Sequence, residues 1–162
     1  PVHSSAMLLQ HNIRSSGFEE RVHIIEAVAW HDHQQQTIYV PSMQDNACLS
    51  RSGAVANLQN RKVKEILVDT VVLDEWLEAH QAISDRVRFV KIDTQGHELF
   101  VLRGLEHLLS SKRPLLVMIE WDERLMRLAG VVPGDVEALF LRHNFILLES
   151  GGDRVYGRDM EL

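Results

Sequence analysis

The sequence predicts an α/β fold. From residue 87 to residue 149 the apolar pattern reads strand, helix, strand, helix, strand, which is the order of a parallel sheet with right-handed crossover connections. Two apolar strands in this stretch, at 87–93 and 114–120, each end in an acid, Asp93 and Glu120. Because parallel strands bind ligands beyond their carboxyl ends, the two acids also indicate where a site would lie.

The composition is that of one folded domain covering residues 1–162. The chain is 45% hydrophobic, which is enough to bury a core. Its net charge of −6 argues against binding to nucleic acid or to an anionic membrane, since both favour a basic face. The single cysteine, Cys48, cannot form an internal disulfide, and no apolar run approaches the roughly 18 residues that cross a bilayer. We therefore expect a cytoplasmic protein.

The first half of the chain begins with a helix. Ser4 and Ser5 are candidate N-caps, Gly17 ends the segment, and the apolar positions of one helical face are Ala6, Leu9 and Ile13. The segments that follow are, in order, a β-branched strand at 21–30, a short strand at 37–40 stopped by Pro41, a polar surface excursion at 45–64, and a short strand that passes into a helix at 71–79.

The second half follows the strand that ends at Asp93. A helix is predicted at 97–109, with a buried face formed by Leu99, Leu102, Leu105 and Leu109. The strand at 114–120 is apolar throughout, so we expect helices over both of its faces. A helix at 133–143 starts with proline, a strand follows at 145–149, and two glycines begin a turn toward Val155.

Each residue of the predicted site has more than one interpretation. Asp93 is either a site acid or a cap for the helix that begins at His97. Glu98 is a site acid, a dipole partner in the first helical turn, or the partner of Lys91, a strand lysine that needs an ion pair. Glu120 would orient a hydroxyl, take its proton, or cap the next segment. His97 has a suitable pKa for a general base, but a surface position is the favoured expectation.

Two further groups of residues are weaker candidates. His31, Asp32 and His33 suggest a metal cluster, but a third ligand from elsewhere would be required, so we expect no metal. Trp30 and Trp121 follow strand ends, where they either line a pocket or pack at the rim of the core.

The segment KIDTQGHEL at 91–99, followed by Leu102-Arg103-Gly104, resembles the signature of FkbM-family methyltransferases, which use S-adenosylmethionine. The resemblance extends over nearly all of the chain. The matching segments are the helix of residues 1–22, the third strand and hairpin at 24–40, the leucine–aspartate segment at 70–77, and the fifth strand at 113–120.

The resemblance implies a Rossmann-like class I methyltransferase sheet and methyl transfer to a hydroxyl oxygen. The acceptor would be a small molecule or glycan, such as a sugar or a secondary metabolite. By the same resemblance, Asp93 lies beside the methionine part of the cofactor and the substrate. Glu26, Ala27 and Val28 fall where this class of fold holds adenine, although Val28 replaces the usual alanine.

The chain also departs from the family pattern. The first strand with its glycine-rich loop, and the second strand with its ribose-binding acid, have no counterpart within residues 1–162. We expect these two strands ahead of Pro1, in a longer chain, and an incomplete sheet here. The strand at 87–93 would then have an open edge that can aggregate or pair with another chain, which leaves a homo-oligomer open. The last strand of the family is at best partial after Val155.

Three functions remain open on the sequence. The first is an O-methyltransferase represented by its C-terminal part. The second is a non-catalytic, methyltransferase-like binding module without cofactor binding. The third is a metal-dependent hydrolase that uses Asp93, Glu98 and Glu120, which the bare motif permits but the missing histidine ligands disfavour.

Overall fold

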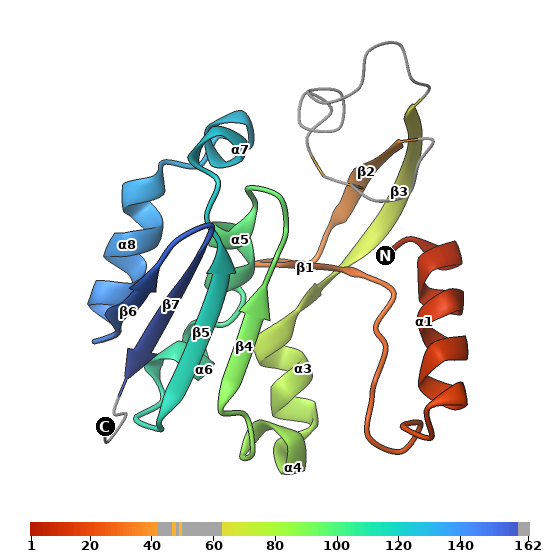
Figure 1. Cartoon of the computed structure of the whole chain (residues 1–162), viewed down its shortest axis with the longest axis horizontal. Coiled ribbons are helices and arrows are strands. Elements are labelled where there is room, and N and C mark those ends of the chain that lie inside the picture. The colour runs from red at the N-terminus through yellow and green to blue at the C-terminus, as the bar shows by residue number, and fades with distance from the viewer. Residues whose placement is uncertain (42–46, 48, 50–62, 159–162) are drawn as a thin grey trace.

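A computed structural model describes residues 1–41, 47, 49 and 63–158 and has a mixed α/β fold with two small sheets (Figure 1). The strands are β1 (Val28–Trp30), β2 (Gln35–Pro41), β3 (Val63–Val72), β4 (Phe89–Ile92), β5 (Leu115–Glu120), β6 (Ile146–Ser150) and β7 (Asp153–Arg158). The helices are α1 (His3–Ser15), α3 (Leu73–Ala79), α4 (Gln81–Ser84), α5 (Glu98–Arg103), α6 (Glu106–Ser110), α7 (Glu123–Leu128) and α8 (Pro133–Arg142).

Helix α1 is present as predicted, but its caps are not the predicted serines. The N-cap is Val2, whose side chain makes no capping hydrogen bond, so Ser4 and Ser5 lie inside the first turn. Of the predicted apolar face only Ile13 is buried. Gly17 follows the helix with a φ of 71°, a left-handed conformation that suits glycine at a helix end.

The first sheet has the strand order β1-β3-β2, with β1 parallel and β2 antiparallel to β3. Strand β3 is ten residues long and starts at Val63, inside the segment predicted as a surface excursion, most of which lies outside the described residues. Strand β1 is only three residues long, so the strand predicted at 21–30 is largely wrong. Residues 22–26 have strand propensity, but no described strand pairs with them, and propensity alone does not hold a strand.

The second sheet has the order β4-β5-β7-β6. Strands β4 and β5 are parallel, as predicted, but β7 is antiparallel to both β5 and β6. The three strands that the pattern predicted, β4, β5 and β6, therefore run in the same direction, and β7 is an antiparallel strand between β5 and β6 that the prediction did not include. The Gly151-Gly152 turn sends the chain back between β5 and β6, and β7 then pairs with all six residues of β5. In the described residues, β7 thus extends from Asp153 to Arg158, along the full length of β5.

The end of β7 is fixed by a buried arginine. Arg158 is 8% exposed, and its guanidinium donates hydrogen bonds to the carbonyl oxygens of Leu109, Arg113 and His143. The same group lies 4.6 Å from the centre of the Phe145 ring. Arg158 therefore ties β7 to the ends of α6 and α8 and to the start of β5.

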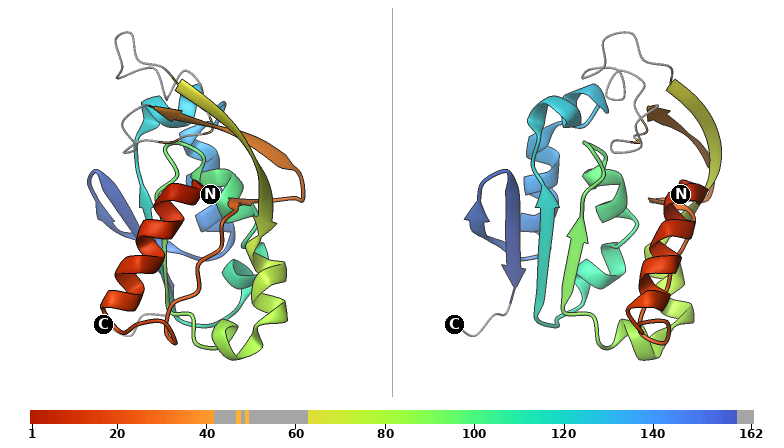
Figure 2. Two further views of the ribbon diagram at one scale, coloured as in Figure 1. Left: turned by 90° about the vertical axis from the view of Figure 1, so that its right-hand side faces the viewer. Right: turned by 45° about the vertical axis from the view of Figure 1, so that its right-hand side comes forward.

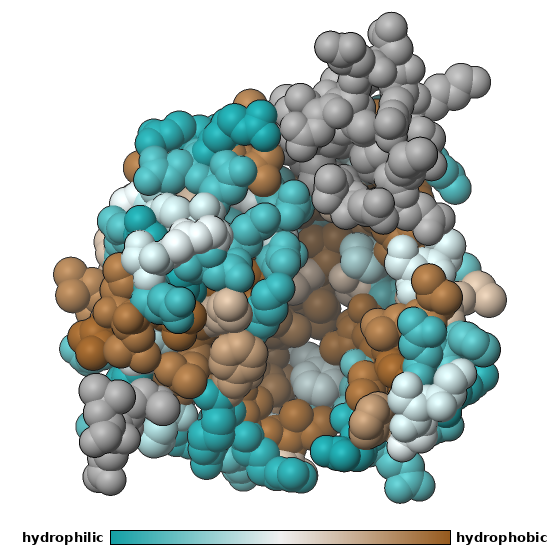
Figure 3. All heavy atoms as spheres, in the orientation of Figure 1, coloured by the Kyte–Doolittle hydropathy of each residue, from teal (hydrophilic) through white to brown (hydrophobic). Residues whose placement is uncertain are grey.

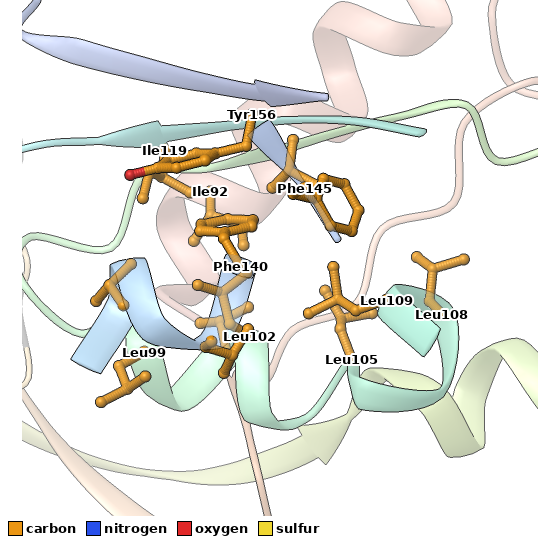
Figure 4. Close-up of a cluster of buried hydrophobic side chains, with 14 of the residues drawn as sticks. Ile92, Leu99, Leu102, Leu105, Leu108, Leu109, Ile119, Phe140, Phe145 and Tyr156 are labelled. Carbon is orange, nitrogen blue, oxygen red and sulfur yellow. The ribbon is translucent and has the colours of Figure 1, made fainter. Parts of the chain in front are cut away.

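The main core lies between the second sheet and a layer of helices (Figure 4). The leucines predicted to form the buried face of the 97–109 helix are all buried: Leu99, Leu102, Leu105 and Leu109. Helices α5, α6 and α8 lie on the same face of the sheet (Figure 2). Residues of β5 alternate between buried and half-buried, so the expectation that helices cover both of its faces is wrong for the described residues.

The predicted helix at 97–109 is divided at Gly104 into α5 and α6. At this point the two backbones approach so closely that a Cβ on Gly104 would overlap the carbonyl oxygen of Trp30, at the end of β1. The carbonyl of Gly104 accepts a hydrogen bond from the amide N of Asp74, and the Asp74 carboxylate caps α6 at the amides of His107 and Leu108. These contacts join β1 and α3 to the helices α5 and α6, which pack on the second sheet.

Strand β4 is an edge strand of its sheet in the described residues, and its Phe89 side chain is 54% exposed. The molecular face in Figure 3 is hollowed between this sheet and α1, with apolar residues in the hollow. No helix in the described part of the chain is long and apolar enough to cross a membrane.

Candidate functional site

The loop between β4 and α5 carries most of the predicted site residues. It turns through two left-handed residues, Gln95 with a φ of 55° and Gly96 with a φ of 95°. The Glu98 side chain, 1% exposed, braces this loop from inside. Its Oε1 atom accepts hydrogen bonds from the amide and hydroxyl of Thr94 and from the amide of Gly96, each at 3.1 Å. Glu98 therefore shapes the loop and does not pair with Lys91.

Lys91 forms the predicted ion pair, and its partner is Asp93. The Lys91 Nζ lies 2.9 Å from the Asp93 Oδ2, and this hydrogen bond raises the pKa of Lys91. Asp93 does not cap α5, since the N-cap residue is His97 and no side chain caps the helix. The Asp93 carboxylate is about half-exposed at the end of β4, where a ligand can reach it.

Gln95 joins the acids at the ends of β4 and β5. Its Nε2 donates to Glu120 Oε2 at 2.9 Å and Oε1 at 3.1 Å, and lies 3.4 Å from Asp93 Oδ1. Glu120 does not cap the next helix, because Asp122 caps α7. Burial, together with the charges of Asp93 and Glu98, raises the pKa of Glu120. The two acids at neighbouring strand ends thus form one cluster.

A cavity of about 300 Å³ opens beside the loop. Its polar wall is formed by Asp93, Thr94 and His97, and its apolar part includes Ala27 and Val28 from the start of β1. Two segments far apart in the sequence, both predicted as site segments, therefore meet in one cavity. Glu120 is not part of its lining and connects to it through Gln95 and Asp93.

His97 is buried, so the expectation of a surface histidine is wrong. Its side chain lies among rings, 6.1 Å from both Trp30 and Phe100 between ring centres, because the first turn of α5 faces β1. Burial lowers the pKa of His97, so the imidazole is neutral at pH 7. Its Nδ1 lies 3.3 Å from the carbonyl oxygen of Thr94, which can accept a hydrogen bond from a protonated Nδ1.

The tryptophans pack against neighbouring side chains. Trp30 is stacked on Phe100 with ring centres 4.2 Å apart and belongs to the smaller core of the first sheet. Trp121 lies under the guanidinium of Arg154, 3.4 Å from the ring centre.

The remaining sequence candidates lie outside the cavity. Glu26 accepts a hydrogen bond from His3 at 2.9 Å on the side of α1, so it does not join Ala27 and Val28. His33 pairs with Glu75 at 2.7 Å. Among the described residues no group of three histidine, cysteine or acidic side chains could hold a metal.

Gln95 and Thr94 are the residues of this site that sequence reasoning missed. Both lie within the 91–99 motif, between the strand-end acid and the glycine turn. A carboxamide at that position can donate two hydrogen bonds toward strand ends, which is a signal that the sequence carries. The contact with Glu120, however, depends on the packing of β4 beside β5.

The comparisons with known proteins give one match. The family model described as "Methyltransferase FkbM domain" matches residues 9–147, which covers most of the chain and both segments that line the cavity. No curated protein and no solved structure matches the chain.

Proposed function

Because the chain belongs to the FkbM methyltransferase domain family, we propose that it transfers a methyl group from S-adenosylmethionine to the hydroxyl oxygen of a sugar or secondary metabolite. The observation that carries this proposal is the meeting of Asp93 with Ala27 and Val28 in one cavity. An acid and a patch of small apolar residues are the two environments that a cationic sulfonium and a flat adenine ring need.

The residues present fit S-adenosylmethionine in their chemistry. The cavity volume of about 300 Å³ is at the lower end of the range for ligand sites, about 300–1,000 Å³. Ala27 and Val28 would hold the adenine by apolar contact, and the Asp93 carboxylate would lie toward the cationic end. The neutral ring of His97 adds no positive charge that would repel the cofactor.

Methyl transfer requires little covalent chemistry from the protein. When bound, the cofactor supplies a methyl carbon already activated for attack. Asp93, which lines the cavity, would orient the acceptor hydroxyl, and the hydroxyl proton would pass to a carboxylate oxygen of Glu120, which lies outside the lining on the far side of Gln95. A carboxylate with a raised pKa is a better proton acceptor, which suits Glu120 to this role. The buried ring of His97 forms part of the cavity wall and keeps water from that side.

Replacement of Asp93 tests the proposal. In an assay of methyl transfer from labelled cofactor to a panel of hydroxyl acceptors, Asp93→Asn should lower the rate by roughly 100-fold or more, because a preorganised charge at the reacting centre is lost. Asp69→Asn is the matched control, since Asp69 accepts a hydrogen bond from Gln35 on the exposed side of the first sheet. Equal rates for wild type and Asp93→Asn would contradict the proposal.

The alternative of a binding module without catalysis is tested by calorimetry. Wild-type protein should release or absorb heat on titration with S-adenosylmethionine, and the Asp93→Asn variant should bind it more weakly. If neither this chain nor one extended ahead of Pro1 binds S-adenosylmethionine or transfers a methyl group, the function is not that of a methyltransferase that uses this cofactor.

A further inference from the structure

Gln95 has a left-handed backbone conformation, which is unfavourable for a residue that carries a Cβ atom. Its φ of 55° is left-handed, which glycine or asparagine adopts more readily than glutamine. The next residue, Gly96, lies so close to the backbone of Leu125 and Met126 that a Cβ there would overlap it. The loop is thus held against α7 on one side and by Glu98 on the other, which fixes the direction of the Gln95 side chain.

The carboxamide of Gln95 lies between two carboxylates. It contacts both oxygens of Glu120 and one oxygen of Asp93, whereas the other Asp93 oxygen binds Lys91. Among the described residues, Gln95 is the side chain that donates hydrogen bonds to Glu120. A neutral group with two N–H bonds is suited to this place, since it bridges two acceptors without neutralising either.

The charged groups around Glu120 come from three elements. Asp93 and Lys91 belong to β4 and its end, Glu98 begins α5, and Asp153 on β7 stands opposite Glu120 in the strand register. Acids outnumber the single lysine, and that lysine is bound to Asp93. Without a donor between them, the two strand-end carboxylates would repel each other.

We infer that Gln95 is the positioning residue of this site, whose carboxamide holds the Asp93 and Glu120 carboxylates together at the ends of β4 and β5. Its part in methyl transfer rests on the proposed function, whereas its hold on Glu120 does not. Gln95 acts through the two acids and does not itself take the hydroxyl proton.

The first test measures Glu120 without any need for activity. The side-chain carboxyl signal of Glu120 is followed by carbon-13 NMR across pH in wild type and in Gln95→Met, which keeps the length of the side chain and removes its hydrogen bonds. Burial and the neighbouring acids raise the pKa of Glu120, and the amide counteracts them. The titration midpoint of Glu120 should therefore move to higher pH in Gln95→Met.

A matched control removes the same kind of contact elsewhere. Gln35 donates to Asp69 at 2.9 Å on the surface, so Gln35→Met should leave the Glu120 midpoint unchanged. If Gln95→Met does not fold, Gln95→Asn serves in its place, because asparagine tolerates the left-handed backbone but its shorter amide falls away from Glu120. An unchanged Glu120 midpoint in the folded Gln95 variant would overturn the inference.

The second test connects Gln95 to the reaction. The acidic limb of the rate profile against pH should move to higher pH in Gln95→Met, in step with the NMR midpoint. A moved midpoint with an unmoved rate profile would refute the role in methyl transfer. If neither this chain nor one extended ahead of Pro1 transfers a methyl group, the proposed function fails, and the NMR titration still decides whether Gln95 holds Glu120.

Discussion

Replacement of Gly104 by alanine should separate the two sheets. A Cβ at this position would lie 3.1 Å from the Trp30 carbonyl carbon and nearer still to its oxygen, whereas ordinary contacts begin at 3.4 Å. The obstacle is backbone at the end of β1, paired to Val72 of β3, so no side-chain rotation relieves it. The added methyl group must therefore push β1 and α5 apart.

The cost follows from the size of this overlap. Overpacking against rigid neighbours lowers the free energy of unfolding by about 1–3 kcal/mol. Because the Gly104 Cβ would meet backbone atoms, we expect a loss at the upper end of this range, about 3 kcal/mol. For a chain of this length that corresponds to a fall of roughly 6–12 °C in Tm. Because Ala27 and Val28, at the start of β1, and His97, the N-cap of α5, form parts of the cavity wall, we also expect weaker binding of S-adenosylmethionine.

Thermal unfolding of Gly104→Ala and Gly134→Ala measures the effect. Gly134 lies in the first turn of α8, and a Cβ there meets nothing within 4 Å. Alanine should raise stability at that position by up to about 1 kcal/mol, because glycine costs more backbone entropy in a helix. If Gly104→Ala has the Tm of wild type, the contact with Trp30 does not fix the spacing of the sheets.

Two further substitutions test the electrostatics and the core. Glu120→Gln should stabilise the protein at pH 7 by less than about 1 kcal/mol, since the substitution removes the charge of a half-buried carboxylate that lies near other acids. A raised pKa of Glu120 means that the folded protein holds this proton more tightly than the unfolded chain, so wild-type stability falls as pH rises through the folded pKa. In urea unfolding below about pH 4, the difference in stability between wild type and Glu120→Gln should therefore vanish. Arg158→Met should lose about 3 kcal/mol in urea unfolding, because three carbonyl groups lose a buried charged donor. Arg127→Met, at a surface pair with Glu123, should lose less than about 0.5 kcal/mol, and equal losses would contradict the reasoning.

The elements that the sequence predicted well are those with a strong local pattern. The periodic leucines of 97–109 and the proline start of the 133–143 helix appear in α5, α6 and α8. The apolar strands that end in Asp93 and Glu120 are β4 and β5, and they pair in parallel. Local hydrophobic period is enough for such elements, because each buries one face against the same core.

Other features depend on contacts between distant segments. The break at Gly104 is set by the approach of Trp30, and the start of β3 at Val63 is set by pairing with β2. His97 is buried because α5 packs toward β1, which no local pattern encodes. The candidate site shows the same division: the acids at strand ends could be predicted, whereas the bridge by Gln95 could not.

The position of β7 in its sheet has a consequence for synthesis. A chain leaves the ribosome N-terminus first at about 5–20 residues per second, so β4, β5 and β6 are made before the strand that lies between β5 and β6. A nascent chain that has not reached residue 153 leaves the facing edges of β5 and β6 without their common neighbour. This sheet therefore closes late in translation, and a stop codon ahead of β7 would remove an interior strand rather than trim an edge.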